Sequence, residues 1–147
     1  MRASTSAKLA LWVNRLLAVF LICLTTRMNV LLDWYQDLRP MGVHGDKAVM
    51  IGFYCCVPVV LLALWNLDKL LRNILKEQVF IRENVRCISL VRWLCLAVCV
   101  ICVPVACLYP PIVFVVIVMA FLALVVSVLT SVMDAAVTIR EENDLTI

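Results

Sequence analysis

Four long apolar stretches alternate with shorter polar segments along the 147 residues of the chain. The last is the clearest, because Ile112 to Met133 contains no charged side chain and consists almost wholly of Val, Ile, Leu, Phe, Met and Ala. About 20 such residues in a helix cross the ~30 Å hydrocarbon layer of a bilayer. The pattern predicts an all-α membrane protein, an antiparallel bundle of four transmembrane helices that forms one domain over residues 1–147. The expected spans are about residues 9–31, 48–67, 88–108 and 112–138, with a connection at 68–87 and a tail at 139–147.

The first stretch is interrupted by Arg15 and Arg27, which leave only Leu16 to Thr26 uncharged between them. An Arg at the centre of a span costs roughly 2.5 to 3.5 kcal/mol, but an Arg near an end can extend its guanidinium to the headgroups. We therefore expect a span whose two Arg side chains reach opposite membrane surfaces. A signal peptide is the competing interpretation, and the lack of a small-residue cleavage site after Thr26 disfavours it.

Lys and Arg are distributed unevenly between the two ends of these spans. Ten of the 13 lie at the start of the first span, around the connection or after the last span. The positive-inside rule therefore predicts that both termini and the connection 68–87 lie in the cytoplasm. The three on the opposite side are Arg27, Arg39 and Lys47.

Pro and Gly predict the turns on the outer side. So little chain lies between the third and fourth spans that Tyr109-Pro110-Pro111 must form a tight hairpin, and Pro-Pro cannot continue a helix. Tyr109 suits the outer interface, where an aromatic ring with a polar tip is favoured. The loop between the first two spans contains Pro40 and Gly42, so we expect turns there rather than a folded module.

The connection continues the helical pattern of the second span beyond the membrane. Apolar residues from Leu67 to Leu75 recur at helical spacing with charged residues between them, which predicts an amphipathic helix to about Glu77. A helix resumes near Glu83 and leads into the third span. Phe80 lies at the bend, where we expect it to pack against the helix ends.

The tail carries three acidic side chains, Glu141, Glu142 and Asp144, on the same side of the membrane as the basic connection. Attraction between the two segments is one interpretation, although exposed ion pairs contribute only ~0 to 1 kcal/mol each. A solvated, frayed terminus is the other. Composition does not decide between them.

The chemistry of the spans favours packing over catalysis. Cys95, Cys99 and Cys102, three of the eight cysteines, share one stripe of the third span, but no His or acidic residue beside them completes a zinc site. Cys here is a small apolar residue suited to close helix contact. We find no nucleophile with a base, no Gly-rich phosphate loop and no paired carboxylates within a span. We therefore expect neither an enzyme nor a cofactor or metal.

Few polar side chains in the spans are suited to transport. Asp68 and Asp134 lie near cytoplasmic ends, where water or a Lys or Arg can reach them. Ser127, Thr130 and Ser131 are expected to bond to their own helix or a neighbouring one rather than to line a pore. Anionic lipid and orientation explain the basic residues at this surface, so we do not expect direct contact with nucleic acid.

Two short cytoplasmic segments resemble the signatures of a bacterial membrane family known as domain of unknown function 2975, the YoaS-like proteins. They are Phe80 to Arg86, followed by an apolar span, and Glu142 to Ile147. The family pattern usually has Ser after the Phe, where it can cap the next helix. Ile81 stands here, so the cap is absent or comes from elsewhere. The resemblance implies four spans and a bacterial cell membrane but no established activity. Because members are often encoded beside small helix-turn-helix regulators, it also implies such a regulator as a cytoplasmic partner.

These observations favour a non-enzymatic integral membrane protein, an adaptor or regulator whose cytoplasmic face binds a partner. Its expected partners are the lipid bilayer and a small helix-turn-helix transcription regulator. The alternative is a small transport or permeability component that works as a homo-oligomer. The residues expected to contact the partner are Phe80, Asn84, Arg86, Glu142, Asn143, Asp144, Leu145, Thr146 and Ile147.

Overall fold

The computed structural model describes residues 2–38, 43–76 and 79–145, which form four long helices and one short 3₁₀ turn. The described residues contain no strand, which confirms the all-α fold class. All four helices are long and apolar enough to cross a membrane, as in a multi-pass membrane protein. Each contains one predicted span. The elements are α1 (Arg2–Leu38), α2 (Val43–Leu75), α3 (Arg82–Leu108), η1 (Pro110–Ile112) and α4 (Val113–Leu145).

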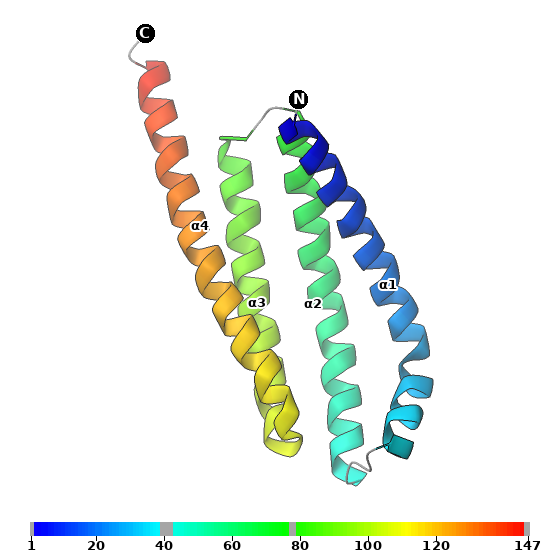
Figure 1. Ribbon diagram of the computed structural model, residues 1–147. Coiled ribbons are helices and arrows are strands. Elements are labelled where there is room, and N and C mark those ends of the chain that lie inside the picture. The colour runs from blue at the N-terminus through cyan, green and yellow to red at the C-terminus, as the bar shows by residue number, and fades with distance from the viewer. Residues whose placement is uncertain (1, 39–42, 77–78, 146–147) are drawn as a thin grey trace.

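The helices run antiparallel and lie side by side in chain order (Figure 1). Among the described residues, α1 packs on α2, α2 on α3 and α3 on α4, whereas α1 and α4 do not pack against each other. The first turns of α1 and α3 and the last turns of α2 and α4 lie at one end of this row, which we call the terminal end. The last turns of α1, the first turns of α2 and η1 lie at the opposite end.

The helices extend beyond the predicted spans. At ~1.5 Å per residue, the 33 residues of α4 reach ~50 Å, well over the ~30 Å of the hydrocarbon layer. At the end opposite the terminal end, α1 continues to Leu38 and α2 begins at Val43, so most of the segment that we expected to form turns is helical. No Pro or Gly interrupts the chain before Leu38, and a helix that is already formed propagates readily. Pro40 and Gly42 lie outside the described residues.

Small side chains allow α2 and α3 to approach closely. A Cβ atom built on Gly52 would lie 2.7 Å from Cγ2 of Val105, closer than real Cβ contacts. One turn of α2 later, the Sγ atoms of Cys56 and the buried Cys102 are 3.9 Å apart. Gly and Cys therefore act as interface residues here, in keeping with the packing role of small side chains between membrane helices.

A pair of tyrosines closes the row at the opposite end. The hydroxyl of Tyr35 near the end of α1 lies 2.7 Å from the hydroxyl of Tyr109, just before η1. The two side chains thus connect α1 to the α3–α4 hairpin. The hydroxyl of Tyr109 therefore bonds to the side chain of Tyr35. Its apolar ring with a polar tip also suits a membrane interface.

Candidate partner-binding face at the terminal end

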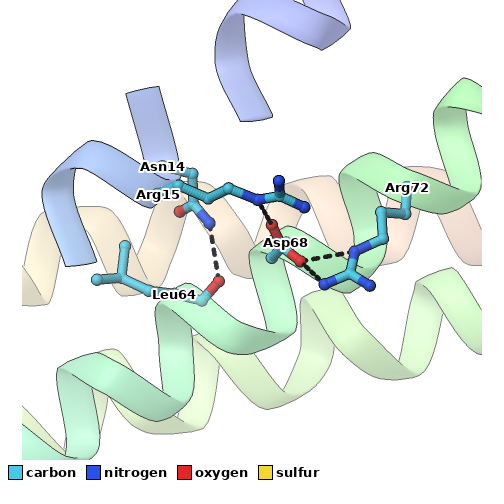
Figure 2. Close-up of polar contacts among 5 residues, drawn as sticks. All are labelled: Asn14, Arg15, Leu64, Asp68 and Arg72. Atoms are coloured by element: carbon cyan, nitrogen blue, oxygen red, sulfur yellow. Dashed lines mark hydrogen bonds and ion pairs between the residues drawn. The ribbon is translucent and has the colours of Figure 1, made fainter. Parts of the chain in front are cut away.

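Asp68 near the end of α2 joins α1 to α2 (Figure 2). Its side chain is only 12% exposed. Arg15 of α1 donates from Nε to one carboxylate oxygen at 3.2 Å. Arg72, one turn further along α2, donates to the other oxygen from Nε at 2.7 Å and also from Nη2. The expectation that a cation reaches Asp68 is confirmed, and these charged hydrogen bonds offset the cost of burying the carboxylate.

Asn14 is a second buried polar residue beside this cluster, and we did not predict it from the sequence. It is 4% exposed, and its Nδ2 donates to the backbone oxygen of Leu64 at 3.0 Å (Figure 2). Its Oδ1 is buried and makes no hydrogen bond within the described residues. An amide in an apolar stretch is costly unless it bonds to a neighbouring helix, and that is the signal that could have identified it.

Hydrogen bonds of the buried Asn84 side chain stabilise the connection between α2 and α3. Asn84 is 0% exposed. Its Nδ2 donates to the backbone oxygen of Val79 at 2.8 Å, and its Oδ1 accepts from Nδ2 of Asn73 at 2.8 Å. Ile81 is the N-cap residue of α3 and makes no side-chain cap hydrogen bond, as its side chain requires. The prediction that Asn84 contacts a partner is corrected, because its amide has no exposed surface and bonds internally.

Ion pairs on the surface link α3 to both of its neighbours. Lys69 of α2 and Glu83 of α3 are 2.7 Å apart, and both are about half exposed. Arg82, the first residue of α3, donates to the two carboxylate oxygens of Glu141 at 3.1 and 2.7 Å. It also lies 3.5 Å from Asp134, so the expectation that a cation reaches Asp134 is confirmed as well.

The tail is attached to the connection by the Arg82–Glu141 pair and is helical to Leu145. Of the two interpretations of the tail, attraction to the basic connection is therefore confirmed. Glu141 lies beyond the predicted span 112–138, and its hydrogen bond from Arg82 lowers its pKa below the ordinary value. Because both side chains are about half exposed, solvent screens the pair and its contribution to stability is small.

The other residues predicted to contact a partner lie on this end of the molecule. Phe80 is 44% exposed, so part of its side chain is available to a partner. Arg86 is exposed on α3, and Leu145 is 87% exposed at the end of α4. The remaining exposed members, on the last turns of α4, are Glu142, Asn143 and Asp144. Thr146 and Ile147 lie outside the described residues.

The hydroxyl groups of α4 form both kinds of hydrogen bond that we expected, within their own helix and with a neighbouring helix. Thr130 and Ser131 donate to backbone oxygens of their own helix at 2.8 and 3.2 Å. The hydroxyl of Ser127 accepts from Arg92 of α3 at 3.4 Å. The side chains of α3 and α4 thus meet through polar contacts below the surface ion pairs.

Comparison with known families finds a match along almost the whole chain. The matching family is described as protein of unknown function (DUF2975), and the match covers residues 10–147. No curated protein and no solved structure matches the chain. Since the match includes all four helices, it extends well beyond the two segments that carried the resemblance. The chain belongs to the DUF2975 family of proteins of unknown function.

Proposed function

We propose that this protein is a non-enzymatic membrane adaptor or regulator whose terminal end binds a cytoplasmic partner protein. The observation that supports the proposal is the set of polar contacts that links all four helices at this end. Because these contacts fix side chains before binding, a partner would meet a preformed surface, and less conformational entropy would be lost. The uneven distribution of Lys and Arg supports a cytoplasmic location for this end.

Two exposed hydrophobic side chains, Phe80 and Leu145, supply anchors on this surface. Exposed aromatic and aliphatic side chains beside polar groups often provide most of the binding energy of an interface. Glu142 and Asp144 add negative charge next to Leu145. A small helix-turn-helix regulator carries a positive DNA-binding surface, so its charge complements that of the tail. Such a regulator would be withheld from DNA while it is bound.

The test compares the full chain with a variant that lacks residues 143–147, each purified from its native membrane in mild detergent with a tag at the N-terminus. Mass spectrometry identifies the proteins that co-purify. We expect the truncation to abolish partner binding, because it removes Leu145 and Asp144 but leaves the Arg82–Glu141 pair. The matched control is Arg140→Gln, which changes an exposed charge on the same turns of α4. If the truncated chain inserts normally and still retains every partner of the full chain, the proposal is refuted.

The alternative role in transport would require several copies of the chain. A row of four helices does not surround a path by itself, whereas the free sides of α1 and α4 could meet other copies. Solute or ion flux through proteoliposomes of the pure protein would support this alternative. Vesicles that stay impermeable would favour the adaptor.

A further inference from the structure

A groove lined by both polar and apolar side chains lies between α3 and α4 at the terminal end. Its volume is about 940 Å³. Residues 82, 86, 89 and 93 of α3 recur at helical spacing, as do residues 130, 131 and 134 of α4, so one stripe of each helix faces the groove. The lining side chains used below are Arg86, Ser89, Leu90 and Trp93.

Two cations at or beside this groove make no ion pair among the described residues: Arg86 lines the groove, and Arg92 lies beside it, next to the lining residue Ser89. Arg86 is exposed and makes no ion pair there. Arg92, less than two turns further along α3, donates to the hydroxyls of Ser89 and Ser127 at 3.4 Å each and lies 5.6 Å from the ring centre of Trp93. All of these partners are neutral. The groove therefore has unbalanced positive charge.

The acidic side chains of the groove do not balance that charge. Glu83 and Asp134 both line the groove. Glu83 is paired with Lys69 at 2.7 Å, and Asp134 lies 3.5 Å from Arg82. Asp134, however, shares Arg82 with Glu141. The cations Lys69, Arg82, Arg86 and Arg92 therefore exceed the acids Glu83, Asp134 and Glu141 by one positive charge, which remains for an anion from outside the chain.

The depth of Arg92 favours a lipid as the source of that anion. It lies ten residues after Arg82, or ~15 Å further into the membrane at ~1.5 Å per residue. Side chains of a helix tilt toward its N-terminus, and Arg92 accordingly donates to Ser89, one turn nearer the surface. Its guanidinium thus reaches toward the headgroup layer, where lipid phosphates lie. Leu90 and Trp93 provide an apolar wall for the acyl chains below.

We infer that the groove between α3 and α4 binds the phosphate of an anionic phospholipid, with Arg86 and Arg92 as its cationic donors. Basic pockets between membrane helices on the cytoplasmic side commonly hold such headgroups. The hydroxyl of Ser89 accepts from Arg92 and keeps its own hydrogen for a phosphate oxygen. Thr130 and Ser131 already donate to their own helix, so recognition depends on α3.

The experiment uses Trp93 as a reporter inside the groove. Trp12, Trp34 and Trp65 are changed to Phe, which leaves one of the four tryptophans. The protein is reconstituted into phosphatidylcholine vesicles that contain a minor fraction of either brominated phosphatidylglycerol or brominated phosphatidylcholine. We expect stronger quenching of Trp93 by the anionic lipid, and less of this preference as ionic strength rises. Equal quenching by the two lipids would overturn the inference without any further variant.

Charge variants then identify the binding residues. Arg86→Gln and Arg92→Gln should each lower the preference for the anionic lipid about fivefold, the factor that ~1 kcal/mol per charge gives. Arg92→Lys should keep most of the preference, and Arg140→Gln, an exposed charge outside the groove, should keep all of it. If Arg86→Gln retains the full preference, or if soluble glycerol phosphate removes it from the unmodified groove, the groove is not a lipid site.

Discussion

Variants of the ion pair between Arg15 and Asp68 test how strongly α1 is held against α2. Among the helices that the structure describes, α1 packs only on α2, and Arg15–Asp68 is the one ion pair between the described residues of these two helices. Arg15→Gln, Asp68→Asn and the double variant form a cycle that isolates the energy of the contact. Asp68→Asn keeps the size of the side chain and removes its charge, whereas Arg15→Gln removes the charge and also shortens the side chain.

The exposure of the two partners sets the expected magnitude. The carboxylate is 12% exposed and the guanidinium 55% exposed. The pair therefore lies between a surface pair, which contributes ~0 to 1 kcal/mol, and a buried pair, whose disruption costs ~3 to 5 kcal/mol. We expect a coupling energy of ~1 to 2 kcal/mol. Asp68→Asn alone should cost ~2 to 3 kcal/mol, because it also weakens the hydrogen bonds from Arg72.

Unfolding by SDS in mixed micelles, followed by circular dichroism, measures these free energies. Asp37→Asn is the matched control, because Asp37 is exposed near the other end of α1. Its effect should stay within ~0.5 kcal/mol. A coupling energy below ~0.3 kcal/mol, which is the usual error of additivity, would show that Arg15 and Asp68 do not stabilise the α1–α2 contact. An Asp68→Asn variant as stable as the control would refute the reasoning as well.

Three further predictions follow from other contacts. Asn84→Ala should lower the free energy of unfolding by ~2 to 4 kcal/mol in the same SDS titration, because the buried Asn84 amide makes two hydrogen bonds that would be lost; a loss under ~1 kcal/mol would contradict this assignment. Gly52→Leu should cost ~1 to 3 kcal/mol, since even a Cβ there lies 2.7 Å from Val105; a variant as stable as the parent would show that α2 and α3 can separate freely. Because Arg82 lowers the pKa of Glu141, the stabilisation from this pair is present above the ordinary carboxyl pKa and is lost as pH falls through the lowered value. Carboxyl ¹³C titration should show the lowered pKa, and Arg82→Gln should restore it; an unchanged titration would contradict the pairing.

The helices could be predicted from sequence because the bilayer allows few alternatives. A long uncharged stretch must satisfy its backbone groups internally, and a helix does so within one segment. From the position of Asp68 near a span end, we also expected that a Lys or Arg could reach it, but the sequence did not identify Arg15 as that residue. The two residues are 53 positions apart, and only the packing of α1 on α2 brings them together.

The burial of Asn84 shows the limit of local pattern in the candidate site. Its neighbours Arg82, Glu83 and Arg86 are charged and exposed, so the segment is typical of a solvated connection. The chain nevertheless turns around the Asn84 amide, which bonds to a backbone oxygen and to Asn73 of α2. Polar character alone therefore could not separate a residue that forms the surface from one that supports it.

The row of helices also explains why polar contacts matter so much at its edges. Lipid chains are as apolar as Leu, so apolar surface gives little preference for a helix neighbour over lipid. Among the described residues, α1 and α4 each pack on one other α-helix. Hydrogen bonds and ion pairs therefore have to supply the stabilisation that additional neighbouring helices would give in a closed bundle. For α1 these contacts are Asn14 and Arg15 at the terminal end and Tyr35 at the opposite end. For α4 these contacts are the solvent-screened ion pairs of Arg82 with Glu141 and Asp134 and the hydrogen bond that Ser127 accepts from Arg92. A protein or lipid that competes for Arg82 would therefore shift the end of α4 before it disturbs α2 and α3.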